Sequence, residues 1–175
     1  MTESHTPKPN QQIISKLQSG NLEQVTETMG ELRETGDSTY IPVLIDLLHS
    51  SRDSEISAKI LTFLADIKNS DVIHHLLDAI QNEKYINERK NLVAICWQNR
   101  FDFSPNLPLF IDLLVREEFE VALEAYTVIT NMTGKINTDM LTAEIAKIKS
   151  LITKVDEQKQ QLLMDVIDFL PQLSI

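Results

Sequence analysis

The sequence is poor in the residues on which many small enzymes and disulfide-rich folds depend. It has one cysteine, Cys96, so an intramolecular disulfide is impossible. Glycine occurs at only 4 of 175 positions, and there is no glycine-rich phosphate loop, G-x-S-x-G elbow or C-x-x-C pair. Aromatic residues are also scarce, at 6% of the chain, so the composition favours helices over β-strands.

Long apolar runs are absent as well. No run approaches the roughly 18 apolar residues that a membrane-spanning helix needs, so we expect no membrane partner. The segment 1–9 is polar, contains Pro7 and Pro9, and lacks the apolar core of a signal peptide, so we expect a disordered lead. Residues 10–175 are expected to form a single repeat domain, and the cytoplasm is the expected compartment.

Positive charge is in short supply. The chain has 16 basic and 26 acidic residues, which give a net charge of -10. Such a surface repels a polyanion, so nucleic acid is an unfavoured partner. The exception is a modest basic group that consists of Lys84, Arg89, Lys90 and Arg100. We interpret this group as a solvated helix face, and nucleic-acid binding is the weaker alternative.

The chain does contain a repeated apolar phrase. PVLIDLL at 42–48 returns as HHLLDAI at 74–80 and as PLFIDLL at 108–114. From Asn10 onward the apolar residues follow helical spacing, and turn signals divide them into ten expected helices in five antiparallel pairs. The phrase predicts equivalent buried positions in three pairs: Leu44, Leu48, Leu76, Ile80, Phe110 and Leu114.

Repetition of the phrase has a physical reason. One amphipathic hairpin cannot bury both of its apolar stripes, whereas like hairpins stacked on one another can. Each hairpin must therefore restate the pattern, which predicts an all-α solenoid. Among the turns, we expect Asp53 or Ser54 to cap the helix after SSRDS, and Ser104 to cap the helix that Pro105 opens.

The stretch YIPVLIDLLHSSRDSEISAKILTFLADI, residues 40–67, resembles one HEAT repeat of the bacterial type also found in phycobilin lyases. The first helix carries Pro42, the turn carries Asp53, and Glu55-Ile56 open the second helix. Over about residues 10–171 the resemblance implies a right-handed α-solenoid of about five HEAT-like pairs, whose second helices line a concave face. HEAT units often carry Arg where this chain has Ser57, so we expect an incomplete Asp–Arg ladder and other contacts that hold the repeats in register.

No group of residues indicates a reaction. His74 and His75 are adjacent and so point about 100° apart on a helix, which disfavours a shared metal ion. Cys96 lies in the apolar run VAICW and is expected to be a buried, inert thiol. We therefore predict a protein that is not an enzyme, with no catalytic residue, cofactor or metal. The recurring acids Asp46, Asp78 and Asp112 are expected to stay solvated.

The predicted working surface is a polar row on the second helices. Helical spacing leaves polar side chains on one outward face of residues 118–132, and the repeat alignment adds equivalent positions in two earlier helices. Amides suit hydrogen bonds to a partner's backbone, and carboxylates suit a basic segment. The predicted partner-binding residues are Glu55, Lys59, Asp66, Asn91, Gln98, Glu120, Glu124 and Asn131. Trp97 is expected either to pack between repeats or to anchor a partner.

These observations favour a non-enzymatic scaffold that binds a protein or peptide, including one with a basic segment, on the concave face. The alternative is an accessory subunit of an enzyme, either lyase-like or chaperone-like. Binding of nucleic acid through Lys84–Arg100 is a weaker third hypothesis.

Overall fold

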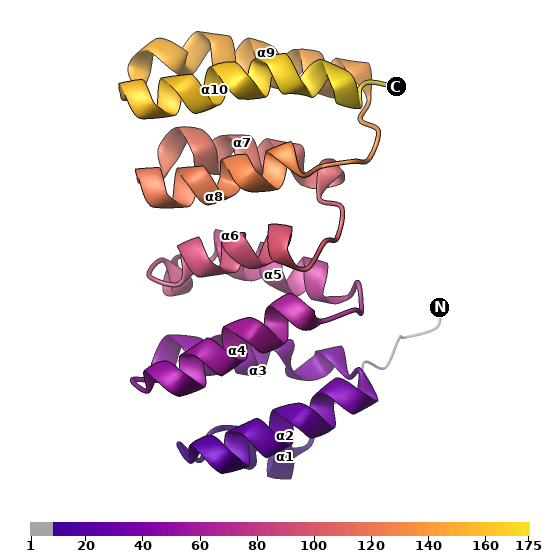
Figure 1. Ribbon diagram of the computed structural model, residues 1–175, viewed down its shortest axis with the longest axis vertical. Coiled ribbons are helices and arrows are strands. Elements are labelled where there is room, and N and C mark those ends of the chain that lie inside the picture. Colours follow the sequence, from indigo (N-terminus) through magenta and orange to yellow (C-terminus); the bar gives the residue numbers. More distant parts are fainter. Residues whose placement is uncertain (1–8) are drawn as a thin grey trace, which may run out of the picture. The chain divides into compact units, whose positions relative to one another are not determined.

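The computed structural model describes residues 9–175, and within that range the chain forms ten α-helices and no β-strand (Figure 1). The all-α prediction and the predicted number of helices are therefore confirmed for the described chain. Eight of the nine residues in the expected disordered lead lie outside the described residues.

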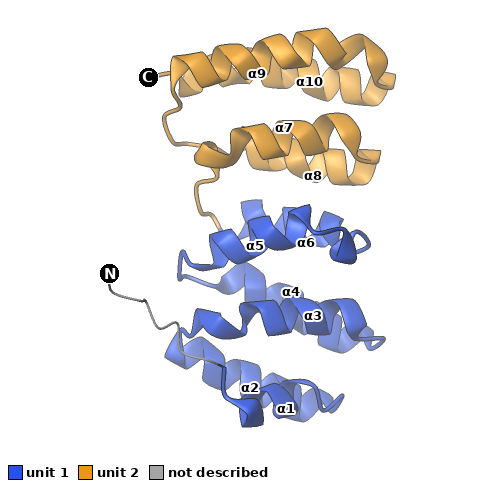
Figure 2. Ribbon diagram, turned by 180° about the vertical axis from the view of Figure 1, so that it is seen from behind, with its two compact units in different colours: residues 1–99 blue, residues 100–175 orange. Residues whose placement is uncertain are grey.

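The chain divides into two compact units, unit 1 up to Asn99 and unit 2 from Arg100 to Ile175 (Figure 2). Unit 1 contains α1 (Gln11–Leu17), α2 (Leu22–Thr35), η1 (Ser38–Tyr40), α3 (Ile41–Ser50), α4 (Ser54–Asp66), α5 (Val72–Gln81), η2 (Glu83–Tyr85) and α6 (Arg89–Gln98). Unit 2 contains η3 (Ser104–Asn106), α7 (Leu107–Arg116), α8 (Phe119–Thr130), α9 (Thr138–Leu151), η4 (Ile152–Lys154), α10 (Glu157–Phe169) and η5 (Leu170–Leu173).

Side-chain caps explain where several helices begin. The carboxylate of Asp53 accepts hydrogen bonds from the backbone amides of Glu55 and Ile56, as the sequence predicts for this turn. Ser104 was expected to cap a helix, and that expectation is wrong, because it is the first residue of η3 and makes no cap bond. Its amide and hydroxyl instead donate to the carboxylate of Asp102.

The helices of unit 1 form three hairpins, α1–α2, α3–α4 and α5–α6 (Figure 1). The second helices pack side by side, with α4 between α2 and α6, and α3 contacts α1 and α5. The repeated phrase supplies the core in both units. All six residues predicted at equivalent positions are buried, which confirms that part of the alignment: Leu44, Leu48, Leu76, Ile80, Phe110 and Leu114.

Unit 2 contains the hairpins α7–α8 and α9–α10, in which α10 packs against both α8 and α7. A buried cation joins these hairpins. The ammonium of Lys159 on α10 donates to the carbonyls of Val115 and Glu117, at 3.1 and 2.9 Å, where α7 ends. Those carbonyls have no partner within their own helix, and the negative end of the helix dipole favours a positive charge there.

Candidate functional site

A groove lies between α2 and α4 in unit 1. It consists of three adjoining hollows of about 130, 440 and 490 Å³. The first two hollows share Arg33 and Phe63, and the second and third share Thr26 and Lys59. The groove therefore follows α2 over its whole length and α4 from Ala58 to its C-terminal end.

Small residues on both walls keep the middle of the groove wide. Gly30 on α2 and Ala58 on α4 line this stretch, above a floor that contains the buried side chains of Met29 and Phe63. A methyl group added to Gly30 would meet no atom within 4 Å, so the space beside this helix is unfilled. The apolar periodicity of α2 requires Val25, Met29 and Leu32 to face inward, which leaves Gly30 on the groove side.

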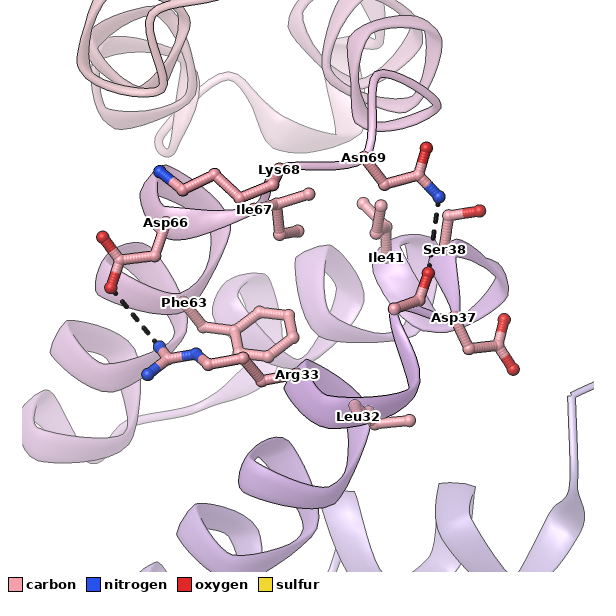
Figure 3. Close-up of a pocket in the computed structure, with 11 residues that line it drawn as sticks. Leu32, Arg33, Asp37, Ser38, Ile41, Phe63, Asp66, Ile67, Lys68 and Asn69 are labelled. Carbon is pink, nitrogen blue, oxygen red and sulfur yellow. Dashed lines mark hydrogen bonds and ion pairs between the residues drawn. The ribbon is translucent and has the colours of Figure 1, made fainter.

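A largely apolar pocket lies at the C-terminal end of the groove, and Figure 3 shows the residues that line it. The buried side chains of Leu32, Ile41 and Phe63 line it together with Ile67, and its volume is about 130 Å³. Polar residues also contribute to the lining: Arg33, Asp37, Ser38, Asp66, Lys68 and Asn69. A cavity of roughly 150 Å³ lined by Leu, Ile and Phe accommodates a benzene molecule. The pocket therefore matches one aliphatic or aromatic side chain and is too small for a larger ligand.

An ion pair borders this pocket. Nη2 of Arg33 donates to Oδ2 of Asp66 at 3.4 Å, and the guanidinium lies 5.6 Å from the centre of the Phe63 ring. Both charged side chains are more than half exposed, so the pair contributes at most about 1 kcal/mol to stability. Arg33 can therefore leave Asp66 at little cost when a partner approaches Phe63.

Three contacts around the pocket each join residues 33 positions apart, two of them between the first and second hairpins and one between the starts of the second and third. Besides Arg33–Asp66, the amide of Asn69 donates to the carbonyl of Gly36 at 3.3 Å, and Ser38 donates to Asp71 at 3.2 Å. The hydroxyl of Ser57 bonds to the carbonyl of Asp53 in its own repeat, at 3.0 Å. The Ser57 hydroxyl is thus used within its own repeat. The contacts between residues 33 positions apart hold neighbouring repeats in register instead.

Charged side chains line the N-terminal end of the groove. Glu23 and Glu27 on α2 and Lys59 on α4 surround the third hollow, together with Leu22 and Thr26. Within residues 9–175 these three charged groups make no hydrogen bond or ion pair through their side chains. The groove thus has an apolar pocket at one end and more negative than positive charge at the other.

The predicted row of partner-binding residues lies on three helices. Unit 1 carries the residues of α4 and α6, which are neighbours, and unit 2 carries those of α8. Glu124 is half-buried and the others are exposed: Glu55, Lys59, Asp66, Asn91, Gln98, Glu120 and Asn131. Of the eight, Lys59 and Asp66 line the groove.

Sequence reasoning missed the α2 side of the groove. The prediction used the aligned outward positions of α4, α6 and α8 and stopped before the first repeat, although Leu32 aligns with Leu64 at a shift of 32. Extending that alignment to α2 points to Glu23, Glu27 and Gly30, which line the groove, and to Glu34. Phe63 carries no such signal, because in sequence it is one more member of an apolar stripe.

Cys96 and the histidines offer no reaction centre. The Cys96 thiol is 1% exposed and contacts the carbonyl of Leu92, and burial raises its pKa far above the ordinary value. Burial and the neighbouring His74 lower the pKa of His75, which favours neutral imidazole. Within residues 9–175 no three His, Cys, Asp or Glu side chains cluster as metal ligands would. Trp97 is 37% exposed.

The basic group contains a residue that a phosphate cannot reach. Arg89 is buried, and its guanidinium donates to the carbonyl of Ile80 and to Glu83, both at 2.9 Å. Lys84 forms an ion pair with Asp46, which also accepts from the Tyr85 hydroxyl at 2.6 Å. Partial burial raises the pKa of Asp46, but these hydrogen bonds outweigh it and hold the pKa below its ordinary value.

The recurring acids of the first helices have different surroundings. Asp112 on α7 forms an ion pair of 2.8 Å with Lys147 on α9, much as Asp46 on α3 pairs with Lys84 from the next hairpin. Asp78 is exposed beside His75 and Tyr85 in a hollow of about 200 Å³. Two of these acids thus connect hairpins, although all three were expected to remain solvated.

Comparison with known proteins adds no family to this description: no protein-family model matches the chain, and no curated protein is significantly similar to it. In the described part of the chain, no helix combines the length and apolar character needed to cross a bilayer.

Proposed function

We propose that this chain is a HEAT-like repeat scaffold that binds a segment of another protein along the α2–α4 groove and catalyses no reaction. The groove itself is the observation that carries the proposal: an unfilled trough ends in a pocket of about 130 Å³ with Leu, Ile and Phe walls. A pocket of this kind takes a single anchoring side chain, and such anchors dominate the affinity of many protein interfaces.

The rest of the groove suits a peptide backbone. Gly30 and Ala58 let a chain approach both helices closely, and the ammonium of Lys59 can donate to a backbone carbonyl of the partner. The hydroxyls of Thr26 and Thr62 bond to carbonyls of their own helices, at 2.6 and 3.0 Å, so their methyl groups remain to contact the partner.

The proposal includes the larger architecture expected from the repeated phrase. In a right-handed solenoid of five HEAT-like pairs, the second helices would form a concave face that begins at α2 and continues through α4, α6 and α8. A longer partner would then leave the groove toward Asn91 and Gln98 on α6, and toward Glu120, Glu124 and Asn131 on α8.

Selection of displayed peptides on the immobilised protein tests the function. Peptides enriched on the natural chain are retested on Gly30→Trp, whose indole would occupy the trough. This change is expected to weaken binding at least tenfold, because it removes space from the groove.

Gln24→Trp is the matched control, since it adds the same side chain to an exposed position of α2 that does not line the groove. Circular dichroism confirms that each variant is folded. Peptides that bind Gly30→Trp and Gln24→Trp equally well would show that the groove is not the binding surface. The double change Glu120→Lys, Glu124→Lys then tests whether the surface extends to α8.

A further inference from the structure

We infer that the groove selects a partner segment in which an apolar side chain is followed or preceded, about three to five residues away, by lysine or arginine. This inference rests on the proposed function and specifies the chemistry of its partner. It follows from the different surfaces at the two ends of one groove.

The apolar half of the motif is set by the pocket. Leu32, Ile41, Phe63 and Ile67 make most of the pocket lining apolar, and the charged groups of Arg33 and Asp66 pair with each other beside it. A polar side chain packed against these four residues would lose its water without gaining a hydrogen bond from them. Leucine, isoleucine, methionine or phenylalanine is therefore the expected anchor.

The basic half of the motif is set by Glu23 and Glu27. The N-terminus of α2 accounts for an acid in its first turn, where Glu23 lies, because a carboxylate there is favoured by the helix dipole. That effect decays within one turn, so it does not account for Glu27. Lys59 offsets only one of the two negative charges, and a cationic side chain of the partner would offset the other.

The spacing follows from helix and strand geometry. Glu27 and Glu23 precede Arg33 by six and ten residues, which correspond to about 9 and 15 Å along the helix axis. An extended peptide advances about 3.3 Å per residue, so three to five residues cover this distance.

NMR titration with synthetic peptides tests the inference, because chemical shifts of the labelled protein report even weak binding. The first peptide carries one leucine and one arginine with three serines between them. In the others, glutamate replaces the arginine, alanine replaces the leucine, or the leucine and arginine are adjacent. The first peptide should bind about three- to tenfold more tightly than the glutamate peptide, and more tightly than the other two.

Charge reversal on the protein provides the decisive comparison. In Glu27→Lys the preference should invert, so that the glutamate peptide binds more tightly than the arginine peptide. Glu31→Lys makes the same change one turn further along α2, where the carboxylate lies 3.9 Å from Lys16 rather than in the groove, and should keep the original preference.

The outcomes separate the two proposals. If leucine peptides bind and Gly30→Trp prevents binding, but arginine and glutamate are equivalent, the basic half of the motif is wrong and the groove remains the binding surface. If no peptide shifts the resonances of groove residues, both the motif and the proposed function are wrong.

Discussion

The two units fasten neighbouring hairpins in different ways. In unit 1, the loop before α3 is joined to the loop after α4 through the half-buried Asn69, whose side-chain amide donates to the carbonyl of Gly36. In unit 2, the loop before α7 is joined to the loop after α8 through the carboxylate of Asp102. One oxygen of that carboxylate accepts from the amides of Thr133 and Gly134, at 3.4 and 3.3 Å, and from Ser104.

The two units also differ in the space around one of their glycines. At Gly30 an added methyl group would enter open space, whereas at Gly134 it would overlap Oδ2 of Asp102 and lie 3.0 Å from the hydroxyl of Ser104. Unit 2 is further closed by the buried ammonium of Lys159. The comparison teaches that neighbouring hairpins can be joined at their loops and still leave space between their second helices, and that this space provides a place for a ligand.

Truncating a core side chain should reduce the unfolding free energy by a similar amount in the two units. Ile80→Ala in unit 1 and Leu114→Ala in unit 2 each remove a fully buried side chain at equivalent positions of the repeated phrase. Each change is expected to cost about 2–5 kcal/mol of unfolding free energy, from lost burial and the cavity left behind. Urea unfolding followed by circular dichroism measures it. A cost below about 0.5 kcal/mol at either site would mean that the two positions are not equivalent core sites.

The boundaries, in contrast, should respond differently. Gly134→Ala forces the Asp102 carboxylate away from the amides that it binds, so we expect a loss of about 1–3 kcal/mol in unit 2. Hydrogen exchange measured by mass spectrometry should show the increased opening in residues 100–175 and not in α1–α4.

A double mutant identifies the cause of that loss. In an Asp102→Ala background the overlap is absent, so Gly134→Ala should cost much less there than in the natural chain. Equal costs in both backgrounds would contradict the assignment to Asp102.

The sequence predicts the helices well and the boundaries poorly, for a physical reason. Apolar spacing is a local signal, so Leu44, Leu76 and Phe110 are recognisable as core positions from a few neighbouring residues. The contact between Asp102 and Gly134 joins two loops about thirty residues apart, and no periodic pattern encodes it. Gly134 looks in sequence like a helix breaker, yet α8 ends before it, at Thr130. The groove exists because small residues of α2 and α4 face each other, and the sequence of either helix alone does not show that the two are neighbours.

The stability of unit 2 should fall at acidic pH, because Asp102 becomes protonated. Partial burial raises the pKa of this carboxyl, but hydrogen bonds from the Ser104 hydroxyl and the Gly134, Ser104 and Thr133 amides outweigh burial and lower it below 3.8. A lowered pKa in the folded state gives stability that is present above about pH 4 and lost as pH falls through the folded pKa.

Asp102→Asn should therefore reduce stability at pH 7 by about 0.5–1.5 kcal/mol, a small loss because the carboxylate is exposed to water. The difference from the natural chain should narrow as the pH falls below about 4, and unfolding curves at pH 7, 4 and 3 would measure it. A difference that stays constant over this range would mean that the Asp102 charge does not hold the boundary.

The smallest effect is expected at Gly30, and it has the opposite sign. Gly30→Ala places a methyl group in the open groove and removes a flexible residue from the interior of α2, so stability should rise by about 0.5–1 kcal/mol. The same measurement that shows Gly134→Ala to be destabilising serves here, and the opposite signs of the two substitutions are the test. If Gly30→Ala also lowers stability, the space beside α2 is filled in solution and the groove is not available to a partner. If stability rises while the affinity for selected peptides falls, Gly30 exchanges helix stability for access to the groove.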